Sequence, residues 1–358
     1  VRAANGVVLI TTKKGSRNHK AKISYDGYVG IQKASNVLEL CNAHEYATML
    51  LEGNYDAYQS HFKQSIDKYG GSYADSDFHN WTFGADNDWY DYLLRTAAIT
   101  NHSLNINGGS EKAVYSVGVS YLYQDGIMDV DNNYKRMNFR GSVDYDATNW
   151  LKVGFNGVFS NSTQQVPNNQ AWQKAFNCPP IVALYDENNE QGFPDKFGSP
   201  DAIGYSSNFY NPVATAKYFD SSKENYQVLS NFYAQIDFIP NFKTNYSYSF
   251  LSTQGREFTP KHYVSSWQQS ATTQLTKNEN KYYNYIWDNT LTYNDQWGKH
   301  RFGAMAGYSM RQEQWRMFEG KASNVPDGAD EYWYIKNGDA AGATVKDDGY
   351  FLLRTSEL

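Results

Sequence analysis

The stretch VYSVGVSYLYQ, residues 114–124, alternates between two kinds of position. Every odd-numbered position holds tyrosine or valine, whereas four of the six even-numbered positions hold serine, glycine or glutamine. Successive side chains of a β-strand point to opposite faces of the sheet. The period of two therefore predicts a strand that has one apolar face and one polar face.

The same period recurs along most of the chain. It is found in residues 21–31, 101–107, 136–145, 151–160, 226–238, 242–250, 283–294 and 300–311, and residues 350–358 read as the beginning of a tenth strand. Most of these segments run about 9 to 13 residues, longer than the 5 or 6 typical of globular strands and close to the roughly 9 to 11 that cross a bilayer at a tilt.

The connections between these segments alternate in length. Short turns are expected at 108–111, 147–149, 240–241 and 295–298, and long connections at 32–99, 125–135, 161–224, 251–281 and 312–348. This alternation is typical of an up-and-down membrane barrel, whereas the Greek-key links of a sandwich give no such pattern. We therefore predict an all-β fold, an antiparallel up-and-down transmembrane β-barrel with long extracellular loops, of which this chain supplies about nine or ten strands as an arc of a larger barrel.

Helical periodicity is expected mainly once, at residues 42–55. Asn42 is a suitable N-cap, and Tyr46, Met49 and Leu50 follow at the i, i+3, i+4 spacing of an amphipathic helix. The sequence thus predicts one short helix within the first long connection.

The composition narrows the class of protein. The 358 residues carry a formal net charge of −6, which argues against a nucleic-acid binder. The 31 Tyr, 19 Phe and 9 Trp exclude a disordered chain. A polar chain this rich in aromatic residues is either a membrane barrel with aromatic girdles or a carbohydrate-binding β-protein.

The first fifteen residues are the most specific string in the chain. VRAANGVVLITTKKG, residues 1–15, resembles the end of the plug domain in the SusC/RagA family of TonB-linked outer-membrane transporters. Residues 86–128 and 134–156 resemble early barrel hairpins of that family. The resemblance implies that residues 1–15 are the C-terminal end of a plug and that residues 16–358 are the N-terminal part of a transmembrane barrel. Because the sequence opens and ends within apparent strands, we expect a fragment of a longer chain.

The resemblance also implies a function. The parent protein would be a plugged barrel of about 22 strands in the cell outer membrane, in contact with outer-membrane lipid. It would import oligosaccharides or peptides with energy from the TonB complex, reached through an N-terminal region that these residues do not include. A SusD-like surface lipoprotein would close over it. The chain is then expected not to be an enzyme and to use no cofactor.

Residue patterns for catalysis and metal binding are weak. None of the seven histidines lies in an H-E-x-x-H motif. Asp129, Asp131 and Asn133 begin like a calcium loop, but Tyr134 and Arg140 stand where that loop needs glycine and glutamate. We predict no catalytic residues and no metal ligands; a looser calcium site stays open at Asp129, Asp131 and Asn132, as does an acidic cluster at Asp186, Glu187 and Glu190.

Aromatic residues in the long connections are candidates for ligand contact. Tryptophan and tyrosine stack on sugar rings and also offer hydrogen bonds at their edges. The substrate-binding residues predicted on this ground are Trp172, Tyr185 and Trp267. The alternative is that these aromatics, together with Tyr205 and Phe209, pack the loops together or touch the lid.

A second functional class remains open at this point. A secreted, soluble β-sandwich or propeller module that binds polysaccharide would also explain the aromatic residues. It would not explain the string at residues 1–15 or the alternating connection lengths.

Overall fold

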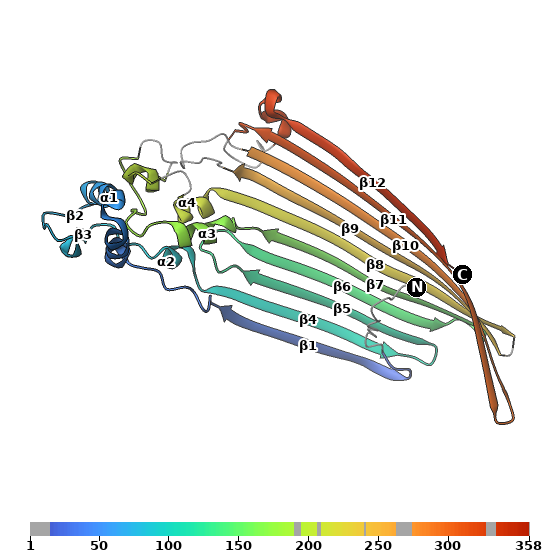
Figure 1. Cartoon of the computed structure of the whole chain (residues 1–358). Helices are drawn as coiled ribbons and strands as arrows, with labels where there is room; N and C mark the ends of the chain where they lie inside the picture. Colours follow the sequence, from blue (N-terminus) through green and yellow to red (C-terminus); the bar gives the residue numbers. More distant parts are fainter. Residues whose placement is uncertain are drawn as a thin grey trace.

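The computed structural model describes residues 15–189, 195–205, 209–239, 241–262, 274–326 and 334–357. Residues 1–14, and with them the predicted strand at 7–12, lie outside this range, as does Trp267. Ten strands form one antiparallel sheet in which each strand pairs with its neighbour in the order β1-β4-β5-β6-β7-β8-β9-β10-β11-β12 (Figure 1). The strands are β1 His19–Gln32, β4 Ala97–Gly109, β5 Ala113–Asp125, β6 Asn133–Asp146, β7 Leu151–Gln165, β8 Phe219–Ile239, β9 Phe242–His262, β10 Gln274–Trp297, β11 His300–Ser323 and β12 Thr344–Glu357.

The sheet is open, with β1 and β12 as its two edges. This arrangement confirms the predicted all-β, antiparallel fold and its character as part of a barrel. In the described residues the long strands form a single sheet, which is neither a two-layered sandwich nor a ring of blades. The architecture that the alternative function assumed is therefore not observed.

The register gives the sheet two distinct faces. Val119, Phe139, Phe159 and Val228 are successive partners across β5 to β8 and share the apolar face. Ser142, Asn156 and Asn231 are partners on the opposite, polar face. The apolar side chains stay largely uncovered, with Phe139 47% and Val29 77% exposed. An apolar face that crosses the whole sheet needs an apolar environment.

The later strands are longer than their hydrophobic pattern predicted. β8 and β9 have 21 residues each, and β10 and β11 have 24 each. The added part of β10 includes the polar run TKNENK, residues 276–281, which nevertheless pairs on both sides. Backbone hydrogen bonds to the two neighbouring strands hold this run in the sheet, although its side chains do not alternate between apolar and polar. The period of two therefore disappears from the sequence while the strand continues.

The connections confirm the predicted alternation. At one end of the sheet, which we call the turn end, the described connections between strands are tight turns, such as 110–112 and 298–299. The other end, the loop end, carries α1 Ala43–Tyr69, α2 Trp89–Leu93, α3 Gln170–Asn177 and α4 Pro212–Lys217, as Figure 1 shows. It also carries the short pair β2 Gly71–Ser72 and β3 Thr82–Phe83, and the 3-10 turns η1 Phe78–Asn80, η2 Pro200–Ile203, η4 Ile335–Asn337 and η5 Ala340–Gly342.

The predicted helix forms but is not the only one described. α1 begins after Asn42, whose side chain accepts from the backbone N–H of Glu45 in a capping box. It then continues past a kink at Asn54 as far as Tyr69, well beyond the expected end at residue 55. α2 and α4 have five and six residues, too few to show a helical period in the sequence.

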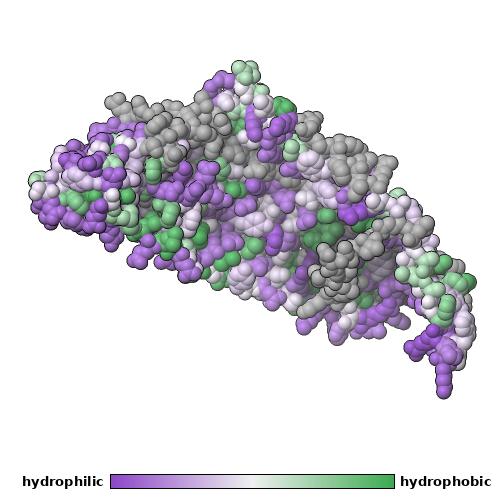
Figure 2. All heavy atoms as spheres, in the orientation of Figure 1, coloured by the Kyte–Doolittle hydropathy of each residue, from purple (hydrophilic) through white to green (hydrophobic). Residues whose placement is uncertain are grey.

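The connections at the loop end pack into a compact unit, which we call the cap: residues 33–96, 126–132 and the described part of 166–218. Its hydrophobic core includes Phe62, Trp89, Leu93 and Ile181, all less than 3% exposed. On the face shown in Figure 2, its described surface is mainly hydrophilic. Among the described helices, none combines the length and the apolar character needed to cross a membrane. The three connections that form the cap are therefore folded structure with a core of their own.

Candidate functional site

A cavity of about 610 Å³ lies where the cap meets the loop-end tips of β5, β6 and β7. We call it the loop-end cavity. Its apolar lining comes from Ile127, Met128, Pro167 and Trp172, and its polar lining is mainly amide. The polar residues and tyrosine that complete the lining are Gln124, Asp125, Asn132, Asn133, Tyr134, Gln164, Gln165 and Asn169.

The β5–β6 connection forms one wall of this cavity, and Arg95 fixes it. The Arg95 guanidinium donates to the Gly126 carbonyl at 3.2 Å and pairs with the Asp125 carboxylate at 2.9 Å. The backbone N–H of Arg95 donates to Ile127, and the N–H of Asp129 donates to Leu93. These contacts come from the last residue of α2 and the segment that follows it, so the wall is held in place without a ligand.

Asn132 is the most buried polar residue of the cavity lining, with 4% exposure. Its side-chain N–H donates to the Met128 carbonyl at 3.0 Å, and its backbone carbonyl accepts from Gly126. The side-chain oxygens of Asn132 and Gln165 have no hydrogen-bond partner in the described residues. Buried acceptors without a donor are costly, so a ligand that carries donors and shifts these side chains slightly would compensate that cost.

The acidic residues of the β5–β6 connection already have partners. Asp129 lies 3.7 Å from Arg95, and Asp131 accepts from the Asn133 side chain at 3.0 Å. In the second acidic cluster, Asp186 pairs with Lys68, and Glu190 lies outside the described residues. No group of three or more metal-binding side chains is found within the described part of the chain.

Trp172 is the predicted site residue that lines the loop-end cavity. It lies on α3, and its ring centroid is 4.9 Å from that of Tyr90 on α2. Packing against Tyr90 supports one side of the indole, while 39% of the residue stays exposed. Trp172 is thus both a packing residue and an accessible aromatic surface.

The other two predicted residues are not brought to this cavity. Tyr185 stacks on Phe197 at 5.1 Å, is 54% exposed, and is not among the cavity-lining residues. Trp267 lies outside the described residues. For Tyr205 the packing alternative holds: it is 7% exposed, its hydroxyl lies 3.2 Å from that of Tyr46, and burial raises its pKa.

Sequence reasoning did not find Arg95 or Gln165, and it named Asn132 only as a possible calcium ligand. Asn132 lies inside the acidic motif that resembled a calcium loop, and that motif was the available signal. Arg95 and Gln165 carry no local signal, because their roles come from contacts across different connections.

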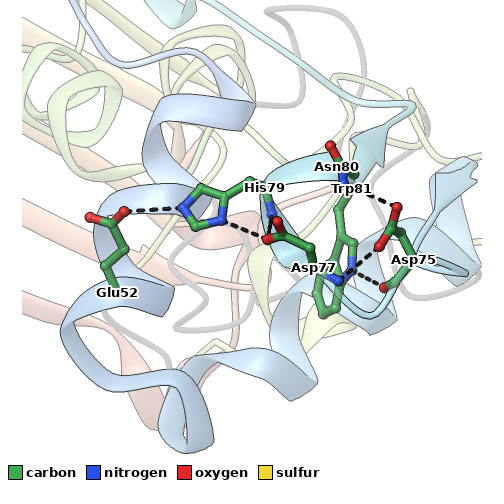
Figure 3. Close-up of polar contacts among 6 residues, drawn as sticks. All are labelled: Glu52, Asp75, Asp77, His79, Asn80 and Trp81. Carbon is green, nitrogen blue, oxygen red and sulfur yellow. Dashed lines mark hydrogen bonds and ion pairs between the residues drawn. The ribbon is translucent and has the colours of Figure 1, made fainter.

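A second polar arrangement lies on the outside of the cap, around His79 (Figure 3). Its Nε2 is 3.1 Å from the Glu52 carboxylate on α1, and its Nδ1 is 2.7 Å from the Asp77 carboxylate. The neighbouring Asp75 accepts from the Asn80 side chain and, through its carbonyl, from Trp81. His79 therefore joins α1 to the η1 segment through two carboxylates.

The junction at His79 should depend on pH. The Glu52 and Asp77 carboxylates raise the pKa of His79 above 6.5, and His79 lowers the pKa of Asp77 below 3.8. The stabilisation is thus fully present between about pH 4 and 6.5 and is lost as pH rises through the raised pKa of His79. It is also lost as pH falls through the lowered pKa of Asp77.

The measurement is the rate at which a protease with little intrinsic pH dependence cleaves residues 73–84 between pH 5 and 9. We expect cleavage to accelerate toward the alkaline end in the wild type and to be nearly flat in His79→Asn. An equal rise in both proteins would contradict the role given to His79.

Comparisons with known proteins agree with the resemblance seen in the sequence. No family model matches the chain. It is 27% identical over 316 residues to TonB-dependent receptor P3 of Formosa agariphila, covering 87% of this chain and 29% of the relative. It is 26% identical over 258 residues to TonB-dependent receptor SusC of Bacteroides thetaiotaomicron, covering 70% of this chain and 23% of the relative.

Solved structures agree as well. The RagAB peptide importer in its closed-closed state aligns with 99% of this chain and 41% of its own, at a TM-score of 0.74 and 18% identity. The open-open state of the same importer gives a TM-score of 0.72. The chain spans about a third or less of the curated relatives it matches. The SusC/RagA-like character predicted from the sequence is confirmed.

Proposed function

Starting from this SusC/RagA-like fold and its TonB-dependent receptor homologues, we propose that the chain is part of a TonB-dependent outer-membrane importer. The observation that carries the proposal is the open, two-faced sheet of ten antiparallel strands, with tight turns at one end and a folded cap at the other. In this assignment residues 1–15 end the plug and residues 16–358 begin the barrel. The apolar face contacts outer-membrane lipid, the loop end faces the outside of the cell and the turn end faces the periplasm.

The substrate enters at the loop end in this proposal. The loop-end cavity suits an uncharged ligand rich in hydrogen-bond donors, because its lining is mainly amide and its one carboxylate, Asp125, is paired with Arg95. Oligosaccharides fit this chemistry through hydroxyl groups and ring faces, and peptides fit it through backbone N–H groups. Trp172 is the residue we assign to ligand stacking, and Tyr185 and Trp267 remain candidates for contacts elsewhere in the loops.

The partners follow from the same proposal. A SusD-like surface lipoprotein would cover the cap, and the TonB complex would act from the periplasm. The rigid attachment of the β5–β6 connection supports a site that is preformed beneath such a lid. The role we propose is transport, with no bond made or broken in the substrate.

Uptake by the full-length gene product tests the proposal. The DNA flanking these 358 residues would be sequenced first, and the whole reading frame expressed in cells with and without functional TonB. Labelled neutral oligosaccharides and labelled oligopeptides are offered separately. We expect one class to enter and its uptake to cease without TonB; entry at equal rates in both strains would refute the proposal.

Replacing Trp172 by alanine should weaken binding of the imported ligand about 30-fold, as loss of a central aromatic contact costs about 2 kcal/mol. Trp172→Phe should keep most of the affinity because it retains a ring. Affinity is measured by titration calorimetry on the detergent-solubilised full-length protein. Trp297→Ala, which removes an exposed tryptophan at the turn end, is the matched control and should bind as the wild type does. Equal affinities of Trp172→Ala and this control would show that Trp172 does not contact the ligand.

A further inference from the structure

Residues 15–18 cross the turn end in unusually close contact with the β4–β5 hairpin. A β-carbon added at Gly15 would collide with the Gly108 carbonyl and would lie 2.7 Å from the Tyr115 carbonyl. A β-carbon at Gly109 would lie 2.5 Å from the Ser16 carbonyl. The glycines at these two positions therefore allow backbone to pack directly on backbone.

Side-chain and backbone bonds hold the same four residues. The Arg17 guanidinium forms an ion pair with Asp146 at the end of β6 and donates to the Glu111 carbonyl at 3.3 Å. The N–H of Asn18 donates to the Ser110 carbonyl at 3.3 Å, and Asn18 has a positive φ of 55°. Arg17 thus joins the start of β1 to a turn and to a strand that is not its sheet neighbour.

The beginning of β1 needs such support. Among the described strands β1 pairs with β4, and the register of this pair is irregular between His19 and Lys22. The pairing becomes regular only from Lys22 onward. A pull on the chain before residue 15 would otherwise act first on this irregularly paired end of β1.

We propose that residues 15–18 form a force-bearing anchor, in which Arg17 passes tension from the preceding segment to the β4–β5 turn and to β6 before it reaches β1. This rests on the proposed function, in which the TonB complex pulls on the plug that precedes residue 15. Arg17 is then a positioning residue: it keeps β1 in place while the segment before it is displaced.

The anchor is not a single strong bond. The side chains of Arg17 and Asp146 are 51% and 27% exposed, and they line a polar recess of about 490 Å³ at the turn end. Water screens an ion pair in such a place, so its contribution is modest. The carbonyl contact to Glu111 and the close backbone packing add to it, and all of these contacts are loaded together.

Single-molecule pulling on the full-length protein in a bilayer tests the anchor directly. The handle is a cysteine introduced at position 11, and the quantity measured is the rate at which β1 detaches at constant force. Arg17→Ala and Asp146→Ala should each accelerate detachment about fivefold, the effect of losing about 1 kcal/mol. Because both variants remove the same pair, the double variant should be no faster than Arg17→Ala.

Arg301→Ala is the matched control, since this arginine also lies at the turn end and its guanidinium hydrogen-bonds to the side chain of Gln296, its partner on the neighbouring strand. It should detach at the wild-type rate. Detachment of Arg17→Ala at the wild-type rate, or additive effects in the double variant, would overturn the anchor.

Uptake measured on the same variants separates the anchor from the proposed function. If residues 15–18 bear force, Arg17→Ala lowers the maximal TonB-dependent uptake rate severalfold. Ligand affinity and the amount of folded protein stay unchanged. Wild-type maximal uptake in this variant would overturn the anchor. TonB-independent uptake by the wild-type protein would instead refute the proposed function, and the pulling result would still decide whether the contacts bear force.

Discussion

Replacement of Trp89 by alanine is expected to lower the free energy of unfolding of the cap by about 3–5 kcal/mol, the range for removing a large aromatic from a core. Trp89 begins α2 and is fully buried. Its indole N–H donates to the Pro179 carbonyl at 3.2 Å, which ties α2 to the segment after α3. The variant therefore loses apolar burial and one of the two hydrogen bonds that the Pro179 carbonyl accepts, the other coming from the Val182 N–H at 3.3 Å.

Two further variants test that account. Trp89→Phe should cost less, about 1–2 kcal/mol, because most of the apolar contact remains and the hydrogen bond is lost. Tyr92→Ala is the matched control on the same helix, because Tyr92 is 42% exposed, and it should change stability little. Local unfolding is measured by amide hydrogen exchange of α1 and α2 in the full-length protein. Equal losses for Trp89→Ala and Tyr92→Ala would show that Trp89 is not a core residue.

The stability of the cap also bears on the loop-end cavity. Tyr90 is next to Trp89 in the chain and supports the ring of Trp172. A cap that opens more often would present Trp172 in varied positions, and binding would weaken through lost preorganisation. Trp89→Ala should therefore lower ligand affinity even though Trp89 does not line the cavity.

Replacing Lys68 by methionine is expected to destabilise the cap by about 3 kcal/mol, near the lower end for breaking a buried ion pair from one side. Lys68, in the last turn of α1, lies 2.9 Å from the Asp186 carboxylate, whose side chain is only 5% exposed. With Lys68 gone, the buried Asp186 carboxylate loses its counter-ion. The same exchange experiment reports the change at the C-terminal turn of α1.

The chain offers a control and a rescue for Lys68. Lys217 pairs with Asp195 at 3.3 Å, but its side chain is 50% exposed, so Lys217→Met should cost less than about 1 kcal/mol. Combining Lys68→Met with Asp186→Leu removes both charges and should recover most of the lost stability. A double variant no more stable than Lys68→Met alone would show that unpaired charge is not the cause.

Residues 114–124 show why the strands could be predicted. The direction of each side chain in a strand is set by its own backbone, so a period of two is visible without knowing the partner strand. The polar run at 276–281 shows where this fails, because ladder bonds extend β10 without any apolar pattern. Of the cap, the sequence predicted only one helix. α2 and α4 are too short for a helical period to show in their sequence.

Trp172 and Tyr205 show why the site could not be fully predicted from the sequence. Both are aromatic residues of the same long connection, and composition gives no reason to separate them. The structure exposes Trp172 at the loop-end cavity and buries Tyr205 against His61, at 4.6 Å between ring centroids. The difference arises from what each ring meets across the cap.

The sequence by itself determined the class of fold, the order of the strands, their two faces and the alternation of short and long connections, because each of these depends on neighbouring residues in the chain. Only the tertiary structure decided that the long connections form a cap with its own core, that Lys68 meets Asp186, and that Arg17 meets Asp146. These partners lie more than a hundred positions apart. Their meeting depends on how the sheet and cap bring distant segments together, which no local pattern encodes.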